Sequence, residues 1–197
     1  MIDAIKLGRL IAEEVVNEAG PCLYPGKFKP PHKGHFEAAM NLASRNYVTE
    51  VIVIISRKTV DGITPEDSMA IWNFYLSAEP SPKIKVQIST HKSPIEDIIA
   101  YLKANPTEDP VYIAGGDDEK DDLGYMESLQ QQFGDRIKPL PIHEKAGNIS
   151  APYVRETLRT GDFESFKETV PEAAFNRGAA PKIFKMLATK ISNEPQP

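Results

Sequence analysis

The sequence predicts an α/β fold, an open parallel sheet of about five strands flanked by helices. Short apolar segments, several of them stopped by glycine, alternate along the chain with longer segments of helical periodicity. Strand, helix, strand, helix implies right-handed crossovers and a parallel sheet. The length of 197 residues, with 41% apolar and 26% charged residues, suits one well-buried globular domain.

Five segments have the character of strands. The second is β-branched throughout and is typical of a fully buried strand, whereas the fifth carries two prolines, which confine it to an edge or a bend of the sheet. In chain order these segments are 22–25, 50–56, 84–89, 111–116 and 137–142.

Helical patterns lie between and after the strands. Ser93 is a plausible N-cap for the third helix, and Ser150 for the one after the last strand. The expected helices cover 35–45, 65–78, 93–104, 123–133 and the segment that begins near 150. The expected organisation is a helix in residues 1–20 packed on the core, a main domain over 21–170, a helical extension over 171–192 and a disordered tail over 193–197.

Composition narrows the class of protein. The net charge of -5 argues against a broad nucleic-acid-binding face. The single cysteine, Cys22, cannot form an internal disulfide and sits in an apolar stretch, as expected of a buried residue in a reducing compartment. The longest purely apolar run, 51–55, is far too short to span a bilayer, and the N-terminus lacks a signal-peptide pattern. We therefore expect a cytoplasmic protein that binds neither membrane nor nucleic acid, with homo-oligomerisation left open.

Three basic segments without acids follow strands of the expected sheet. They are 26–35, with three lysines and two histidines, then 56–58, and then 145–155, which holds Lys145 and Arg155. Ligands of open parallel sheets bind outside the carboxyl ends of the strands, so these segments should meet at one edge. A polyanion such as a nucleoside triphosphate is the ligand that explains all three basic segments most simply.

His32 and His35 fall in the first turn of an expected helix, three residues apart and therefore on one face. The positive end of the helix dipole lowers the pKa of a histidine, so both can be neutral donors. Gly34 between them lets a phosphate approach the backbone. A zinc site that adds His91 and His143 is less favoured, because no cysteine or carboxylate joins them at metal-ligand spacing.

Arg155 also lies near the start of a helix, where a cation is disfavoured, and Arg159 follows one turn later. Glu156 could soften this arrangement. A bound anion explains it better, because Arg155 and the free N–H groups of the helix start can hold it together. We therefore expect Arg155 to be unfavourably placed in the empty protein and favourably placed once an anion is bound.

These residues carry a family resemblance. "GKFKPPHKGH" (26–35) resembles the G-x-F-x-P-x-H-x-G-H signature of the nucleotidyltransferase superfamily, the "HIGH" group. "ISAPYVR" (149–155) is similar to its second signature, I-S-x-x-x-[IV]-R. The resemblance covers about residues 21–170, implies a Rossmann-like fold, and is strongest to nicotinamide-nucleotide adenylyltransferases. "KAGNISAP" lacks the Arg-Thr pair and the two threonines usual in cytidylyltransferases.

The resemblance implies transfer of a nucleotidyl group, AMP above others, from a triphosphate to a phosphate monoester such as nicotinamide mononucleotide, with release of pyrophosphate. It assigns catalytic roles to His32, His35 and Arg155, and acceptor binding to Arg57 and Lys58, with no protein-bound metal and Mg²⁺ as counterion of the triphosphate. The remaining nucleotide-binding positions implied are Gly26, Lys27, Phe28, Lys29, Lys33, Gly34, Gly116, Asp117, Ile149 and Ser150.

One departure bears on the acceptor. Such adenylyltransferases often have a Glu-Arg pair in the helix after the second strand, where this chain has Asp67 and Ser68. Two other functions therefore remain open: a cytidylyltransferase that acts on a small phosphorylated alcohol, and a nucleotide-binding sensor without catalysis.

Overall fold

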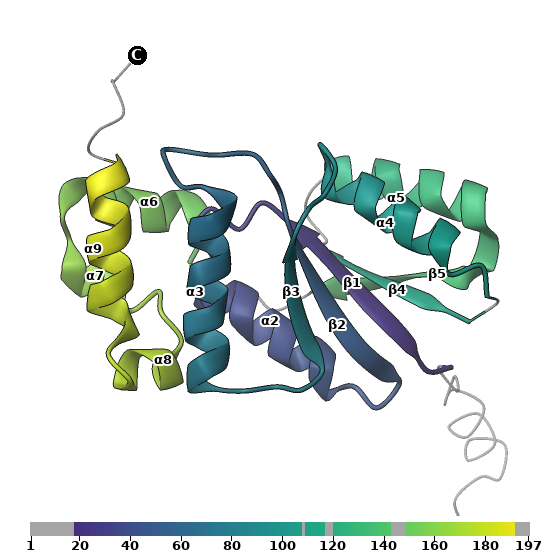
Figure 1. Ribbon diagram of the computed structural model, residues 1–197, viewed down its shortest axis with the longest axis horizontal. Helices are drawn as coiled ribbons and strands as arrows, with labels where there is room; N and C mark the ends of the chain where they lie inside the picture. Colours follow the sequence, from purple (N-terminus) through teal and green to yellow (C-terminus); the bar gives the residue numbers. More distant parts are fainter. Residues whose placement is uncertain (1–17, 108, 117–119, 143–148, 192–197) are drawn as a thin grey trace, which may run out of the picture.

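The computed structural model describes residues 18–107, 109–116, 120–142 and 149–191. The expected N-terminal helix and tail lie almost wholly outside these residues. The described strands form one five-stranded sheet in the order β3-β2-β1-β4-β5, and every neighbouring pair is parallel. The predicted α/β fold with an open parallel sheet is therefore confirmed (Figure 1).

All five predicted strands form, each within a few residues of its predicted bounds. They are β1 (Gly20–Gly26), β2 (Val48–Ile55), β3 (Ile84–Ile88), β4 (Val111–Gly116) and β5 (Ile137–Ile142). Among the described strands, β5, which carries two prolines, pairs only with β4 and forms an edge of the sheet, as its composition predicts.

Helices cover both faces of the sheet. They are α2 (Lys33–Ser44), α3 (Pro65–Ala78), α4 (Pro94–Ala104), α5 (Lys120–Phe133), α6 (Ala151–Thr160), α7 (Phe163–Lys167), α8 (Glu172–Asn176) and α9 (Ala179–Ile191). In Figure 1, α4 and α5 lie on one side of the sheet, α2 and α3 on the other, and α7 to α9 lie beyond α3.

Alternate residues of the central strands feed two cores. On β2, Val51 and Val53 join the core beneath α2 and α3, whereas Ile52 and Ile54 join the core beneath α4 and α5. Residues of α9, such as Leu187, belong to the first core, so the C-terminal helices pack as part of the same body. None of the described helices is long and apolar enough to cross a membrane.

Cys22 lies in β1 and is fully buried. Burial raises the pKa of its thiol to about 12, so the reactive thiolate is not available at neutral pH. The interpretation of Cys22 as a buried packing residue is confirmed.

Candidate active site

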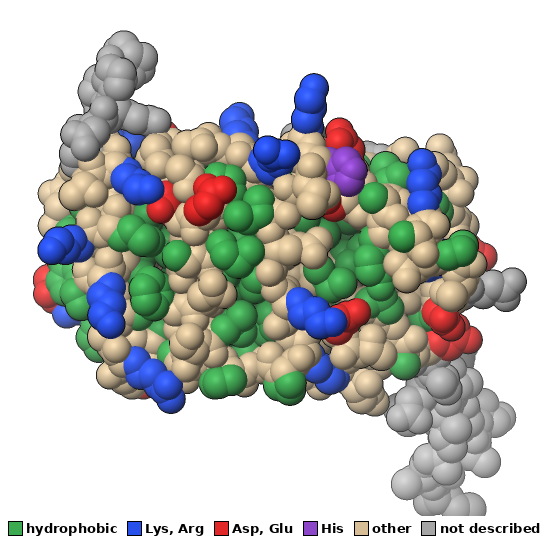
Figure 2. All heavy atoms as spheres, in the orientation of Figure 1, with side chains coloured by type: hydrophobic (Ala, Val, Ile, Leu, Met, Phe, Trp, Pro, Cys, Tyr) green, Lys and Arg blue, Asp and Glu red, His purple; other side chains and the backbone are tan. Residues whose placement is uncertain are grey.

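The carboxyl end of the sheet brings the basic segments together. Lys29, from the loop after β1, donates to the backbone oxygen of Ser56, directly after β2 (3.2 Å). Arg155 of α6 donates from Nη1 to the backbone oxygen of Lys29 (2.8 Å). Lys and Arg side chains lie along the same edge in the space-filling view, with a few acids among them (Figure 2). The loops after β1 and β2 and the start of α6 therefore form one site.

Phe28 shapes the loop after β1. Its backbone is in the left-handed region (φ 51°), and its ring is buried in edge-to-face contact with Tyr24, His35 and Trp72. A Cβ added at Gly26 would lie 2.6 Å from the ring of Phe28. Glycine is therefore required at 26 so that the Phe28 ring can fold back over the end of β1.

The two signature histidines stack on one another at the start of α2. Their ring centroids are 3.7 Å apart, and His32 is the N-cap residue. The backbone N–H of His32 donates to Nδ1 of His35 (3.3 Å). Because that nitrogen accepts, the neutral His35 ring carries its proton on Nε2. His32 is buried, and its Nδ1 has no hydrogen-bond partner among the described residues.

Burial keeps this histidine pair neutral. It lowers the pKa of His32 to about 4. For His35, burial together with the neighbouring His32 holds the pKa well below its ordinary value. Desolvation thus dominates, rather than the helix dipole alone. The pair meets a ligand as two uncharged rings, one with a donor at Nε2.

Lys29, predicted to bind nucleotide, is bonded inside the protein in this structure. Its side chain is 1% exposed, and Nζ donates to the Ser56 oxygen and to Ser68 Oγ (3.1 Å). Burial lowers the pKa of Lys29 to about 8, against the attraction of Glu66 and Asp67. Lys29 therefore ties together the ends of β1, β2 and α3. Lys27 of the same loop is exposed.

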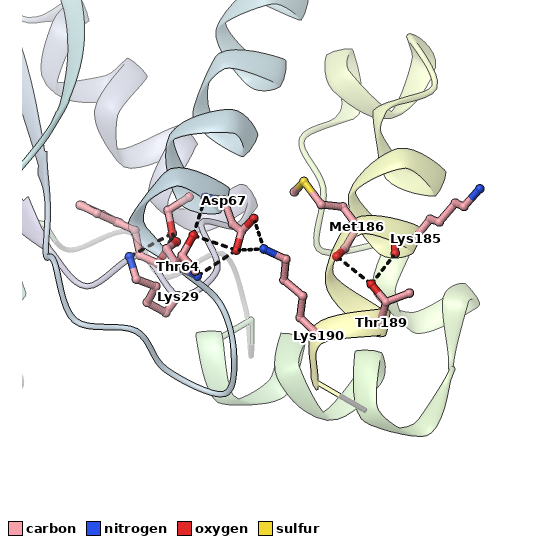
Figure 3. Close-up of polar contacts among 9 residues, drawn as sticks. Lys29, Thr64, Asp67, Lys185, Met186, Thr189 and Lys190 are labelled. Carbon is pink, nitrogen blue, oxygen red and sulfur yellow. Dashed lines mark hydrogen bonds and ion pairs between the residues drawn. The ribbon is translucent and has the colours of Figure 1, made fainter. Parts of the chain in front are cut away.

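Asp67 and Ser68, the residues that depart from the family pattern, support this loop. Ser68 Oγ donates to the backbone oxygen of Phe28 (2.6 Å). Asp67 forms a capping box with Thr64 at the start of α3, and Lys190 of α9 donates to both of its carboxylate oxygens (2.7 Å each), as Figure 3 shows. Both side chains are buried, and these contacts are all within the protein.

Ser150 caps α6 as predicted, accepting from the backbone N–H of Tyr153 (3.3 Å). Ile149 packs against the core. The Ser150 hydroxyl is therefore committed in part to the helix, although Ser150 itself is exposed.

The expectation that Arg155 is unfavourably placed in the empty protein does not hold, because the side chain is paired with an acid. Its Nε donates to Oδ2 of Asp61 (2.6 Å), and the side chain is 17% exposed. Arg159 Nη2 lies 3.4 Å from the same carboxylate oxygen, and Arg159 also pairs with Glu156. One acid from the β2–α3 loop thus offsets two arginines of α6, Arg155 and Arg159.

The other predicted residues take different positions. Gly34 is buried within α2, whereas Lys33 pairs with Glu37 (3.7 Å), and its backbone N–H donates to the oxygen of Thr169 (2.7 Å). That first N–H of α2 is already satisfied in this structure. Arg57 and Lys58 are exposed after β2, and Arg57 contacts the backbone oxygen of Thr90 (3.4 Å).

Gly116 ends β4, and Asp117, Lys145 and His143 lie outside the described residues. His91 follows β3 and pairs with Asp97 (2.9 Å). Among the described residues, no group of three or more His, Cys, Asp or Glu is placed to hold a metal ion.

Asp61 is the site residue that the sequence reasoning missed. It occupies the left-handed region (φ 48°), followed by Gly62 (φ 71°), and the flanking Val60 and Ile63 form an antiparallel bridge. Asp-Gly between apolar residues is the signal for a two-residue type I′ hairpin turn. That signal, in "TVDGIT", could have placed Asp61 at the tip of a defined hairpin.

Comparison with known proteins identifies the fold. No family model matches the chain, and a sequence search of curated proteins finds no match. Two structures of Plasmodium falciparum nicotinic acid mononucleotide adenylyltransferase, complexed with APC and with NaAD, superpose with TM-scores of 0.59 at 15% identity. They cover 83% and 85% of this chain and 96% and 98% of theirs.

A bifunctional NMN adenylyltransferase/ADP ribose pyrophosphatase from Francisella tularensis gives a TM-score of 0.59 at 13% identity. It matches over 87% of this chain and 53% of its own. The comparison therefore establishes the fold. This chain has the Rossmann-like fold of the mononucleotide adenylyltransferases, as the two signatures predicted. At such identities the likeness establishes the fold alone.

Proposed function

We propose that the protein is a nucleotidyltransferase that moves AMP from ATP to a phosphate monoester, nicotinamide or nicotinic acid mononucleotide being the first candidates, and releases pyrophosphate. The observation that carries the proposal is the stacked, neutral pair of His32 and His35 at the start of α2. It lies at the carboxyl edge of a fold that the mononucleotide adenylyltransferases share.

The pair suits phosphoryl chemistry that needs positioned donors rather than a nucleophile. A neutral ring with its proton on Nε2 can donate to a phosphate oxygen and keep donating as charge develops there. The buried Nδ1 of His32, which has no partner within the described part of the chain, supports the same role, because a buried polar atom without a partner is costly unless a ligand satisfies it. No covalent intermediate is needed: the acceptor phosphate attacks the α-phosphorus in line while pyrophosphate departs.

The other residues have roles of position and charge. Arg155 would hold the terminal phosphates with the donors that Asp61 leaves free, aided by exposed Lys27. Gly26 and Phe28 shape the loop beneath the nucleoside. Arg57 and Lys58, exposed at the end of β2, are the proposed contacts for the acceptor phosphate.

Mg²⁺ belongs to the proposal as the counterion that enters with the triphosphate. It would neutralise the β and γ phosphates beside Arg155. In the part of the chain that the structure describes, no group of three or more His, Cys, Asp or Glu is placed to hold a metal ion.

A panel assay tests the proposal. ATP, CTP, GTP and UTP are each crossed with nicotinamide mononucleotide, nicotinic acid mononucleotide, phosphopantetheine and glycerol 3-phosphate, and pyrophosphate is measured. We expect release only with ATP and a mononucleotide together. Release with CTP and glycerol 3-phosphate would assign a cytidylyltransferase instead. Nucleotide binding without pyrophosphate from any pair would identify a sensor and overturn the proposal.

A further inference from the structure

A small hairpin in the β2–α3 loop contacts two helices, α6 and α9. Val60 and Ile63 exchange both backbone hydrogen bonds (3.2 and 2.9 Å), which places Asp61 and Gly62 at the tip. Ile63 is fully buried, so the base of the hairpin is anchored in the core. The tip of the hairpin therefore has a defined position, unlike the tip of a free surface loop.

The far side of the hairpin rests on α9. A Cβ added at Gly62 would lie 3.0 Å from the backbone oxygen of Lys190. The Lys190 side chain then pairs with Asp67, whose carboxylate accepts from Thr64, the residue that leads out of the hairpin into α3 (Figure 3). Close packing and an ion pair thus hold this side of the hairpin against the C-terminal helix.

The near side of the hairpin contacts α6 through Asp61. The carboxylate accepts from Arg155 Nε, and the Lys29 oxygen accepts from Arg155 Nη1. Two bonds from different nitrogens of one planar guanidinium fix the plane as well as the position of the group. Within the described part of the chain, Nη2 of Arg155 has no partner, which leaves it as a donor for an anion.

We propose that Asp61 is a positioning residue for nucleotide binding: it holds the Arg155 guanidinium in the orientation in which Nη2 meets the terminal phosphates of the triphosphate. The inference rests on the proposed function and adds a residue to it. Arg155 is then ordered before the ligand arrives, so less conformational entropy is lost on binding. Asp61 also lies beside Arg159 and reduces the repulsion between the two arginines.

Three variants separate positioning from other roles. Asp61→Gly removes the carboxylate and suits the left-handed backbone of the turn, so the hairpin keeps its shape. Asp61→Asn keeps an oxygen that can accept from Arg155 Nε, and asparagine tolerates this conformation as well. Glu156→Gln is the matched control, because it removes an acid that pairs with Nη1 of Arg159 and not with Arg155.

Calorimetric titration of each full-length variant with ATP, inorganic tripolyphosphate and AMP, together with steady-state kinetics, tests the proposal. We expect Asp61→Gly to raise the Kd for ATP and tripolyphosphate about tenfold, with the loss in KM rather than kcat, the scale of one hydrogen bond to a charged group. Binding of AMP should be unchanged. Asp61→Asn should recover most of the affinity, and Glu156→Gln should match the parent.

Two results would overturn the role. Tighter binding by both Asp61 variants would mean that the carboxylate competes with phosphate for Arg155. Unchanged Kd values with a lower melting temperature would mean that Asp61 only stabilises the fold. Failure of the unmodified protein to bind ATP is a different result: it rejects the proposed function, and the positioning role with it.

Discussion

His32 and His35 form a stacked pair of imidazole rings, with centroids 3.7 Å apart, at the positive end of α2. Two charged imidazolium ions could not stack in this way at low cost, and burial already disfavours protonation of either ring. The pair is therefore held in its uncharged form across the neutral pH range, and the tautomer of His35 is set by the backbone N–H of His32.

The first prediction concerns pH. A histidine of ordinary pKa would titrate near 6.5, but burial lowers the pKa of His32 to about 4 and that of His35 well below its usual range. We expect kcat/KM to stay level as the pH falls through 6.5 and to decline only below about pH 5. The neutral form is favoured in the folded state, so stability should also fall between pH 6.5 and about 4. An acid limb centred near 6.5 in the rate profile would contradict this.

The second prediction removes each ring. His32→Ala and His35→Ala should each lower kcat by about 10²–10³, the range for losing one preorganised donor. His35→Ala also removes the acceptor for the His32 N–H, which should cost about 1 kcal/mol of unfolding free energy. Glu37→Gln, exposed on the same helix, is the control and should leave kcat unchanged. Near-normal turnover in both alanine variants would remove the pair from catalysis.

The third prediction contrasts two lysines of one loop. Lys27→Met should weaken ATP binding and leave the melting temperature unchanged, because Lys27 is exposed. Lys29→Met should shift the melting temperature and leave ATP affinity within about twofold, because Lys29 is buried and bonded to Ser56 and Ser68. Thermal unfolding and titration with ATP measure both. The reverse pattern would show that Lys29 leaves its internal partners to bind phosphate.

The fourth prediction concerns Arg155. Arg155→Ala should weaken ATP binding by roughly 1.5–3 kcal/mol and leave AMP binding unchanged, because AMP lacks the terminal phosphates. Without nucleotide, loss of the Asp61 pair should cost about 1 kcal/mol or less of stability. Arg159→Ala, more exposed on the same helix, provides the comparison. Equal losses for AMP and ATP would place the contact elsewhere than on the terminal phosphates.

Much of the fold could be predicted because its strands carry strong local signals. The β-branched run of β2 and the glycines that end β1 and β4 mark strands in any context. The two prolines of β5 predicted an edge because Pro139 and Pro141 cannot donate to a second neighbour. Ser93 and Ser150 predicted helix starts, since an N-cap bond is local in sequence.

The sequence-based expectations failed for side chains whose partners are set by tertiary contacts. Lys29 belongs to the signature loop, and nothing in its neighbours along the chain shows that Ser68, 39 residues away, accepts from its Nζ. The pairing of Arg155 with Asp61 joins residues separated by 94 positions. A side chain in a basic segment can serve the ligand or the scaffold, and only the fold distinguishes the two.

The most direct measurement follows labelled phosphorus through the reaction. ATP labelled at the α or the γ phosphorus is incubated with Mg²⁺, the acceptor mononucleotide and the full-length protein, and the products are separated. We expect the α label in a dinucleotide and the γ label in pyrophosphate, with both products formed about 10²–10³-fold more slowly by His35→Ala. Appearance of γ label as inorganic phosphate, or bound ATP that stays intact beside every acceptor tested, would contradict nucleotidyl transfer.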